Sequence, residues 1–165
     1  MSEKKYGIFY GSTTGSTEGV AKKLAEVLNV AAEDVHNIAE TSPVKFGEYD
    51  YILAGTSTWG SGEVQDDWYD ALDGMEALVL KGKKVAVFGC GDENMSDTFC
   101  GAVGVLYKKF AQTGAEMKGQ FNAEGYVFED SEARISDDLM CGLVLDEVNK
   151  PELTDGRIKE WVKTL

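Results

Sequence analysis

Residues 5–28, KYGIFYGSTTGSTEGVAKKLAEVL, hold the first strand, the first turn and the first helix of the predicted fold. The segment KYGIFYG (5–11) is largely apolar, as expected of a strand that is buried on both faces. Residues 16–28 then repeat apolar side chains at helical spacing, namely Val20, Leu24, Val27 and Leu28. The segment therefore predicts a strand that leads through a turn of small residues into an amphipathic helix.

The same alternation continues along the chain. Further strands are predicted at residues 34–39, 50–56, 83–91, 115–119 and 140–145. Further helices are predicted at residues 63–78 and 97–113, with a last helix that has Thr154 as its N-cap. Because apolar strands alternate with helices, we expect an α/β fold with a doubly wound parallel sheet. No linker or repeat interrupts the pattern, so we expect a single domain over residues 1–165.

Composition argues against a membrane or secreted protein and against disulfide and metal sites. The chain has 165 residues, of which 43% are hydrophobic, and its apolar runs are too short for a membrane span or a signal peptide. We therefore expect a cytoplasmic protein. Cys90, Cys100 and Cys141 have no CxxC spacing, which favours buried thiols over a disulfide framework or a zinc site. The single histidine, His36, lies in a predicted strand and makes a histidine metal site improbable.

The net charge of −13 makes nucleic acid a poor partner, because binding to phosphates needs a basic patch. An acidic surface suits docking to basic patches of other proteins. It also suits plain solubility, and charge alone does not separate these two interpretations.

The turn between the first strand and the first helix, Ser12 to Thr17, reads STTGST. A helix N-terminus offers unpaired amides and a positive dipole end, and these hydroxyls add neutral donors, so the turn can cradle a phosphate. It lacks the lysine of a nucleotide-triphosphate loop and the glycine spacing of a dinucleotide loop. Taken alone, it fits an ordinary Ser/Thr-rich turn equally well.

Two further segments reach the same edge of the predicted sheet, where ligands bind in such folds. After the third strand, TSTWGSGE (56–63) places Trp59 among small polar residues, which favours a stacking platform. After the fourth strand, GCGDENMSD (89–97) supplies glycines and a carboxylate. A phosphate cradle, an aromatic plate and polar contacts together predict a planar aromatic ligand that carries one phosphate.

These motifs resemble those of the flavodoxins. STTGST fits their T-x-T-G-x-T phosphate loop with serine in the first position, and TSTWGSGEVQDDW and GCGD…TFCGAV are similar to their two ring-binding loops. GYVFEDSEA…GLVLDEVN…LTDGRIKEWV resembles the C-terminal part of the long-chain subfamily. The resemblance implies a flavodoxin-like sheet of order 2-1-3-4-5 whose fifth strand is interrupted by an insertion at about residues 120–139.

The resemblance also implies function. It predicts non-covalently bound FMN and low-potential, one-electron transfer between redox proteins, without an enzymatic activity of its own. The partners would be a reductase donor and an acceptor, both with basic docking patches, and the chain would act as a monomer.

Carried over position by position, the resemblance assigns the FMN phosphate to Ser12, Thr13, Thr14, Gly15, Ser16 and Thr17. It places Thr56, Ser57 and Thr58 near the ribityl chain and ring. Trp59 would cover one face of the ring, and Gly60 would lie beside the flavin N5 atom. Cys90, Gly91 and Asp92 would border the pyrimidine edge, although Asp92 could also be a solvated loop carboxylate.

The sequence departs from the family at the second face of the ring, where flavodoxins often place a tyrosine. The corresponding position is Met95, and we predict that its thioether covers the ring. The alternative is that Met95 points to solvent and leaves this face partly open.

Charge around the ring predicts a low second reduction potential. No cation lies within Ser12 to Thr17, and several acidic residues are expected near the ring, namely Glu63, Asp66, Asp67, Asp92 and Glu93. Added negative charge on the flavin would then be disfavoured.

Two other functions share this topology. An FMN-dependent NAD(P)H:quinone reductase would need a pocket for nicotinamide and quinone, and no residue set outside the three loops suggests one. A phosphoacceptor signalling domain would need acidic residues after the first and third strands, where the sequence has Gly11, Ser12 and Thr56 to Trp59.

Overall fold

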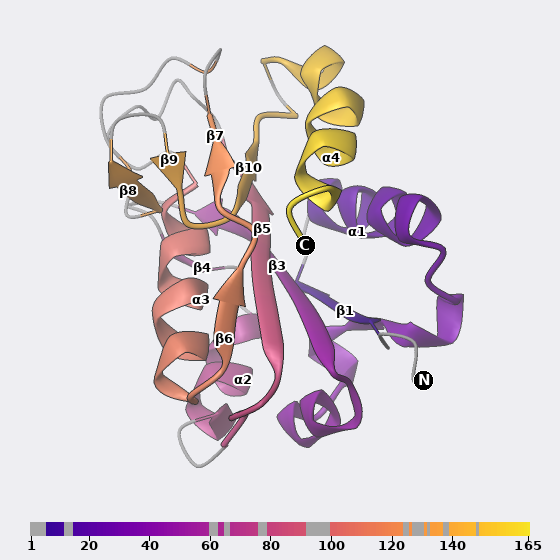
Figure 1. Ribbon diagram of the computed structural model, residues 1–165, viewed down its shortest axis with the longest axis vertical. Coiled ribbons are helices and arrows are strands. Elements are labelled where there is room, and N and C mark those ends of the chain that lie inside the picture. The colour runs from indigo at the N-terminus through magenta and orange to yellow at the C-terminus, as the bar shows by residue number, and fades with distance from the viewer. Residues whose placement is uncertain are drawn as a thin grey trace.

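A parallel sheet forms the centre of the computed structural model, which describes residues 6–11, 15–59, 63–64, 67–75, 79–91, 100–123, 126, 131, 133–136, 139–147 and 149–165. Its strands, in spatial order, are β2 (Val35–Asn37), β1 (Tyr6–Gly11), β3 (Tyr51–Trp59), β5 (Lys84–Cys90) and β10 (Leu143–Leu145). All neighbours in this series are parallel. β6 (Glu116–Lys118) also pairs in parallel with β5, so β6 and β10 are the two halves of the fifth strand (Figure 1). The predicted order 2-1-3-4-5 with an interrupted fifth strand is confirmed.

The interruption contains a small antiparallel sheet of its own. Its strands are β7 (Phe121–Asn122), β8 (Arg134–Ser136) and β9 (Leu139–Met140), in the order β7-β9-β8. The predicted strand 140–145 is therefore split, because Met140 belongs to β9 and only Leu143–Leu145 joins the main sheet.

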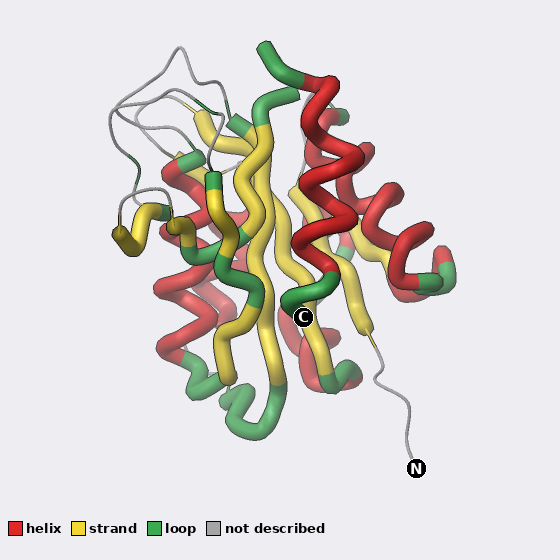
Figure 2. Tube along the Cα trace, turned by 45° about the horizontal axis from the view of Figure 1, so that its top comes forward, coloured by secondary structure: helices red, strands yellow, loops and turns green. Residues whose placement is uncertain are grey.

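Helices cover both faces of the main sheet (Figures 1 and 2). α1 (Ser16–Leu28) and α4 (Thr154–Val162) pack together on one face. α2 (Asp67–Met75) and α3 (Gly101–Gln112) lie on the other. Short 3-10 helices occupy Ala32–Asp34, Ile38–Glu40, Pro43–Glu48 and Pro151–Leu153.

The predictions for two helix beginnings are wrong. The helix predicted at residues 63–78 begins only at Asp67, because Glu63–Val64 forms β4 and pairs antiparallel with β3. Thr154 is not the N-cap of α4, since the chain is already helical in the preceding 3-10 turn. Its hydroxyl instead donates to the carboxylate of Glu147.

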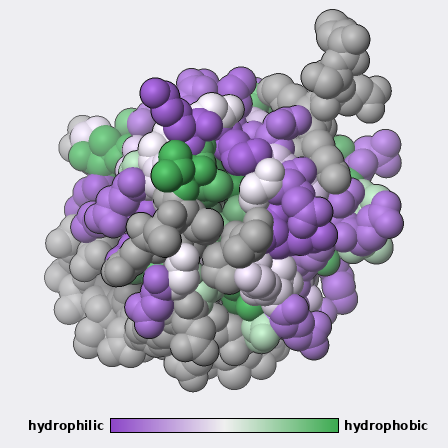
Figure 3. All heavy atoms as spheres, turned by 90° about the horizontal axis from the view of Figure 1, so that it is seen from below, coloured by the Kyte–Doolittle hydropathy of each residue, from purple (hydrophilic) through white to green (hydrophobic). Residues whose placement is uncertain are grey.

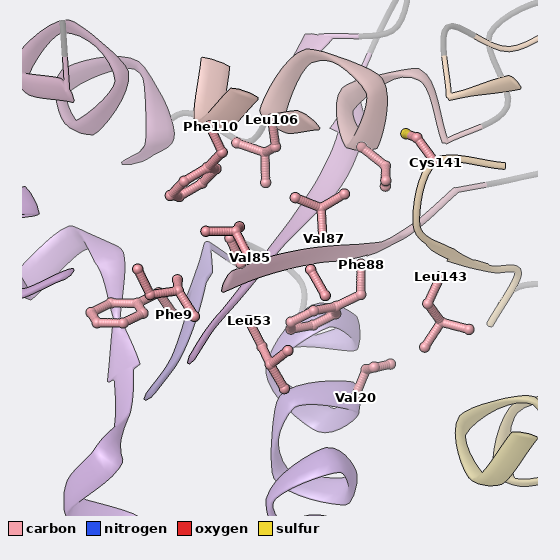
Figure 4. Close-up of a cluster of buried hydrophobic side chains, with 14 of the residues drawn as sticks. Phe9, Val20, Leu53, Val85, Val87, Phe88, Leu106, Phe110, Cys141 and Leu143 are labelled. Carbon is pink, nitrogen blue, oxygen red and sulfur yellow. The ribbon is translucent and has the colours of Figure 1, made fainter. Parts of the chain in front are cut away.

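The core has two layers, one on each side of the sheet. In Figure 4, Val20, Phe88 and Leu143 lie on the α1 side of β5, whereas Val87 and Leu106 lie on the α3 side. This alternation follows from the strand period of two, and both layers are apolar because helices cover both faces. Trp68 and Trp161 are buried in this core, and all three cysteines are free, buried thiols as predicted.

One face of the molecule is mainly polar where it is described. Seen from below in Figure 3, hydrophilic residues cover most of the described surface and leave only small hydrophobic patches. Within the described ranges, no helix combines the length and the apolar character that a membrane span requires.

Candidate functional site

The carboxyl ends of three parallel strands meet at one edge of the sheet. Gly11 at the end of β1 is in register with Thr56 of β3. Ser57, the next residue of β3, is in register with Cys90 at the end of β5. The sequence predicted that the segments after these strands would come together. The described strand ends meet as this requires, and most of the segments themselves lie outside the described residues.

The first turn of α1 lies at this edge, where Thr17 bonds to Ser57 of β3. Gly15, which precedes the helix, has φ of 94° and provides no side-chain cap. A residue with a Cβ is strained at that φ, although the space beside Gly15 is empty. The first amides of a helix have no intrahelical acceptor and lie at the positive end of its dipole, so this turn offers neutral donors to an anion.

The hydroxyl of Thr17 points inward, into the protein. Thr17 Oγ1 and Ser57 Oγ are 2.9 Å apart, and either oxygen can be the donor. Thr17 is 0% exposed and Ser57 is 8% exposed, so this hydrogen bond is shielded from water. It connects the first turn of α1 to the end of β3.

Cys90 lies beside this pair. Burial raises the pKa of the Cys90 thiol to about 12, with a smaller rise from the Glu147 carboxylate, while a hydrogen bond from Thr17 lowers it. The thiol is therefore neutral near pH 7, which makes it a weak hydrogen-bonding group and a poor nucleophile.

The end of β3 is longer than predicted. Thr56, Ser57, Thr58 and Trp59 belong to the strand rather than to a loop, and Trp59 pairs with Glu63 of β4 in an antiparallel hairpin. The Thr56 hydroxyl donates to the Ser57 carbonyl at 2.8 Å. Trp59 thus stands at a strand end, at the edge where the ligand is expected.

The end of β5 is closely packed. The Gly91 amide donates to the Leu145 carbonyl at 2.9 Å, which ties this end to β10. A Cβ on Gly91 would lie 2.7 Å from the Cys100 backbone nitrogen, so no larger residue fits without a shift. The Cys100 thiol also reaches the Leu145 carbonyl, at 3.6 Å.

Two acidic residues at this edge, Asp146 and Glu147, follow β10 and were not predicted from the sequence. Asp146 is fully buried and accepts hydrogen bonds of 2.8 Å from both the backbone and the side-chain nitrogen of Asn149. The available signal was their position directly after the last apolar strand, where the chain reaches the ligand edge.

Six predicted site residues lie outside the described part of the chain: Ser12, Thr13, Thr14, Gly60, Asp92 and Met95. Thr58 and Trp59 are described for their backbone only. The described members are Gly15, Ser16, Thr17, Thr56, Ser57, Cys90 and Gly91, all of which belong to the first turn of α1 or the ends of β3 and β5.

The groups at the first turn of α1 and at the ends of β3 and β5 suit a phosphate monoester better than a metal. The described polar groups there are helix amides, hydroxyls and a neutral thiol, whereas the nearby carboxylates of Asp146 and Glu147 accept hydrogen bonds from Asn149 and Thr154. Among the described residues, no group of three or more metal-binding side chains is found.

Comparisons with known proteins agree with this architecture. The profile of the flavodoxin family matches residues 8–161. Flavodoxin 1 of Escherichia coli K12 is 42% identical over 160 residues, which cover 96% of this chain and 91% of that protein. The flavodoxin of Haemophilus influenzae is 40% identical over 160 residues, covering 96% of this chain and 92% of that protein.

Solved structures give the same result. A Fusobacterium nucleatum flavodoxin bound to flavin mononucleotide superposes with a TM-score of 0.87 at 28% identity, covering 98% of this chain and 96% of that chain. A Streptococcus pneumoniae flavodoxin superposes with a TM-score of 0.74 at 27% identity, covering 97% of this chain and 96% of that chain. Sequence, sheet order and edge geometry thus agree, and the chain belongs to the flavodoxin family.

Proposed function

We propose that this chain binds FMN non-covalently and carries single electrons between redox proteins, without catalysing a reaction of its own. The observation that carries the proposal is the juxtaposition of the first turn of α1 with the ends of β3 and β5 in a member of the flavodoxin family. FMN, when bound, supplies a ring that accepts and releases electrons one at a time.

The chain's residues bind and orient the ligand. The first turn of α1, with Gly15, Ser16 and Thr17, holds the phosphate through neutral donors, together with Ser12, Thr13 and Thr14. The strand end from Thr56 to Trp59 and Gly60 lies along the ribityl chain and one ring face. Cys90, Gly91 and Asp92 border the pyrimidine edge, and Met95 covers the second face.

The finer assignment is to the long-chain flavodoxins. It is supported by the segment between β6 and β10, which contains the sheet β7-β9-β8. The net charge of −13 supports basic redox proteins as electron donor and acceptor. We further propose that the protein is a cytoplasmic monomer.

A titration of the FMN-free full-length chain with FMN tests the ligand. We expect one FMN per chain, with quenching of flavin fluorescence on binding. Gly15→Ala should weaken FMN binding, because a Cβ at φ of 94° must shift the turn. Gly82→Ala is the matched control, since Gly82 has φ of 90° and equally open surroundings but lies in the turn before β5.

Saturable binding that Gly15→Ala weakens and Gly82→Ala does not would support the assignment of the phosphate to α1. Absence of FMN binding would overturn it. Rapid reduction of the bound flavin by NAD(P)H alone, without a reductase protein, would instead favour a quinone reductase-type enzyme.

A further inference from the structure

A buried hydrogen bond joins the first turn of α1, which we propose to hold the phosphate, to the neighbouring strand β3. It connects Thr17 Oγ1 and Ser57 Oγ at 2.9 Å across 40 positions of sequence. Thr17 lies in the first turn of α1, and Ser57 lies at the end of β3 opposite Cys90. The bond therefore links the turn that we propose to hold the phosphate to the strand end that we propose to contact the ribityl chain and the ring.

The Thr17 hydroxyl carries one proton. A hydroxyl can donate only one hydrogen bond while accepting two, and Ser57 Oγ is a partner of this hydroxyl. If Thr17 donates to Ser57, its proton is unavailable to an anion at the helix N-terminus. If Ser57 donates to Thr17 instead, the proton of Thr17 is free.

The bond also fixes the position of the first turn. Thr17 is 0% exposed, so bulk water cannot take the place of Ser57 as the hydrogen-bond partner of its hydroxyl. Loss of the Ser57 hydroxyl therefore leaves the buried Thr17 hydroxyl with one partner fewer. The α1 turn can then move relative to β3, and its amides move with it.

We propose that Ser57 is a positioning residue for the phosphate, acting through Thr17, and that it raises the affinity for flavin with a phosphate over flavin without one. The inference rests on the proposed function, because it takes FMN as the ligand. It goes further because it assigns to Ser57, on the strand expected beside the flavin ring, an effect on the binding of the phosphate.

The competing explanation is that the bond only supports the fold. In that case its loss would lower stability and would weaken binding of FMN and riboflavin to the same extent, since both share the ring and the ribityl chain. The ratio of the two dissociation constants distinguishes positioning from general support, because overall destabilisation cancels in it.

The test measures dissociation constants for FMN and riboflavin on the full-length chain. We expect Ser57→Ala to lower the affinity for FMN about tenfold more than the affinity for riboflavin, the effect of one buried hydrogen bond. Ser57→Thr restores a hydroxyl and should restore the FMN to riboflavin ratio. Ser131→Ala is the matched control, because Ser131 is also buried and hydrogen-bonded but lies in the segment before β8.

A double-mutant cycle adds a second readout. Because Ser57 acts through Thr17, the pair Thr17→Val and Ser57→Ala should lose no more FMN selectivity together than Thr17→Val loses alone. If Ser57→Ala is too unstable to measure, Ser57→Cys keeps the size with a weaker donor and should change the ratio in the same direction.

Two results would overturn the role of Ser57 while leaving the proposal of FMN binding intact. One is an unchanged ratio of the FMN and riboflavin dissociation constants in Ser57→Ala, and the other is additive losses of selectivity in the double-mutant cycle. Absence of FMN binding in the wild-type chain would overturn the proposed function and this inference together.

Discussion

At Gly55, in the middle of β3, an added Cβ would lie 2.2 Å from the buried ring of Phe88. Gly55→Ala should therefore force the ring or the strand to move, at a cost of about 1–3 kcal/mol. Gly156→Ala is the control, because a Cβ there meets nothing within 4 Å and α4 should gain about 0.5–1 kcal/mol of stability. Urea denaturation measures both, and equal stability of the two variants would refute the packing argument.

His36 predicts a pH dependence of stability. Its Nε2 lies 2.6 Å from the Tyr49 hydroxyl, which donates to Asp34, and its ring stacks on Phe9. Burial lowers the pKa of His36, and Lys45 adds to this, while Asp34 and Glu48 oppose it. The folded state thus holds the proton less firmly than the unfolded chain, whose histidine pKa is about 6.5.

Stability from His36 is therefore present above about pH 6.5 and is lost as the pH falls below it. The urea midpoint should decrease from about pH 7.5 to about pH 5.5, ahead of most carboxylate titration. His36→Gln should flatten this part of the profile, since the chain has one histidine. An unchanged slope in that variant would mean that other groups cause it.

Single residues also show how far the site could be predicted. The residue types at the ligand edge were predictable, because small hydroxyl residues and glycines follow apolar strands. The hydrogen bond between Thr17 and Ser57 was not predictable, because it joins positions 40 residues apart and depends on the register of the sheet. Asp146 was missed for a similar reason, since its burial depends on the local turn with Asn149.

Among the elements, α1 was predicted with its observed bounds, Ser16–Leu28, because its buried residues follow the helical period closely. The beginning of α2 was not predicted correctly, because Val64 fits the apolar helical pattern but pairs with Thr58 in a hairpin. Tertiary pairing outweighs local periodicity there. At Thr154 the capping pattern was misread because a 3-10 turn already precedes the helix.

The attachment of the small sheet to α4 depends on Arg157. Its guanidinium carbon lies 5.6 Å from the centre of the Phe121 ring and 5.3 Å from that of Tyr126. It also donates to the Asn122 carbonyl at 3.1 Å. Arg157→Leu should cost about 1–2 kcal/mol and speed amide exchange in β7 and β9.

Lys159→Leu is the control for this prediction, because Lys159 is exposed on the same helix and leucine and lysine have similar helix propensities. Its effect should stay within about 0.5 kcal/mol. Equal effects of the two variants would mean that the ring contacts of Arg157 do not hold the small sheet.

At the scale of the whole molecule, the sheet order was predictable because both the strand and helix alternation and the family resemblance point to it. The internal structure of the insertion was not, since its strands are two or three residues long and carry no clear period.

The overall charge predicts salt-sensitive electron transfer. With a net charge of −13, the reduced protein should react with a basic haem protein such as cytochrome c at a rate that falls as salt is added. The range from about 0.01 M to about 1 M ionic strength shortens the Debye length from about 30 Å to about 3 Å. A small neutral oxidant is the control, and equal salt dependence for both would contradict electrostatic docking.

The central claim is that the chain carries electrons singly on FMN. The most direct measurement is a redox titration of the FMN-loaded protein followed by visible absorbance. We predict two separate one-electron steps, the second at low potential, with an absorbance band between them that belongs to neither the oxidised nor the fully reduced flavin. A single two-electron step with no such band would contradict the account.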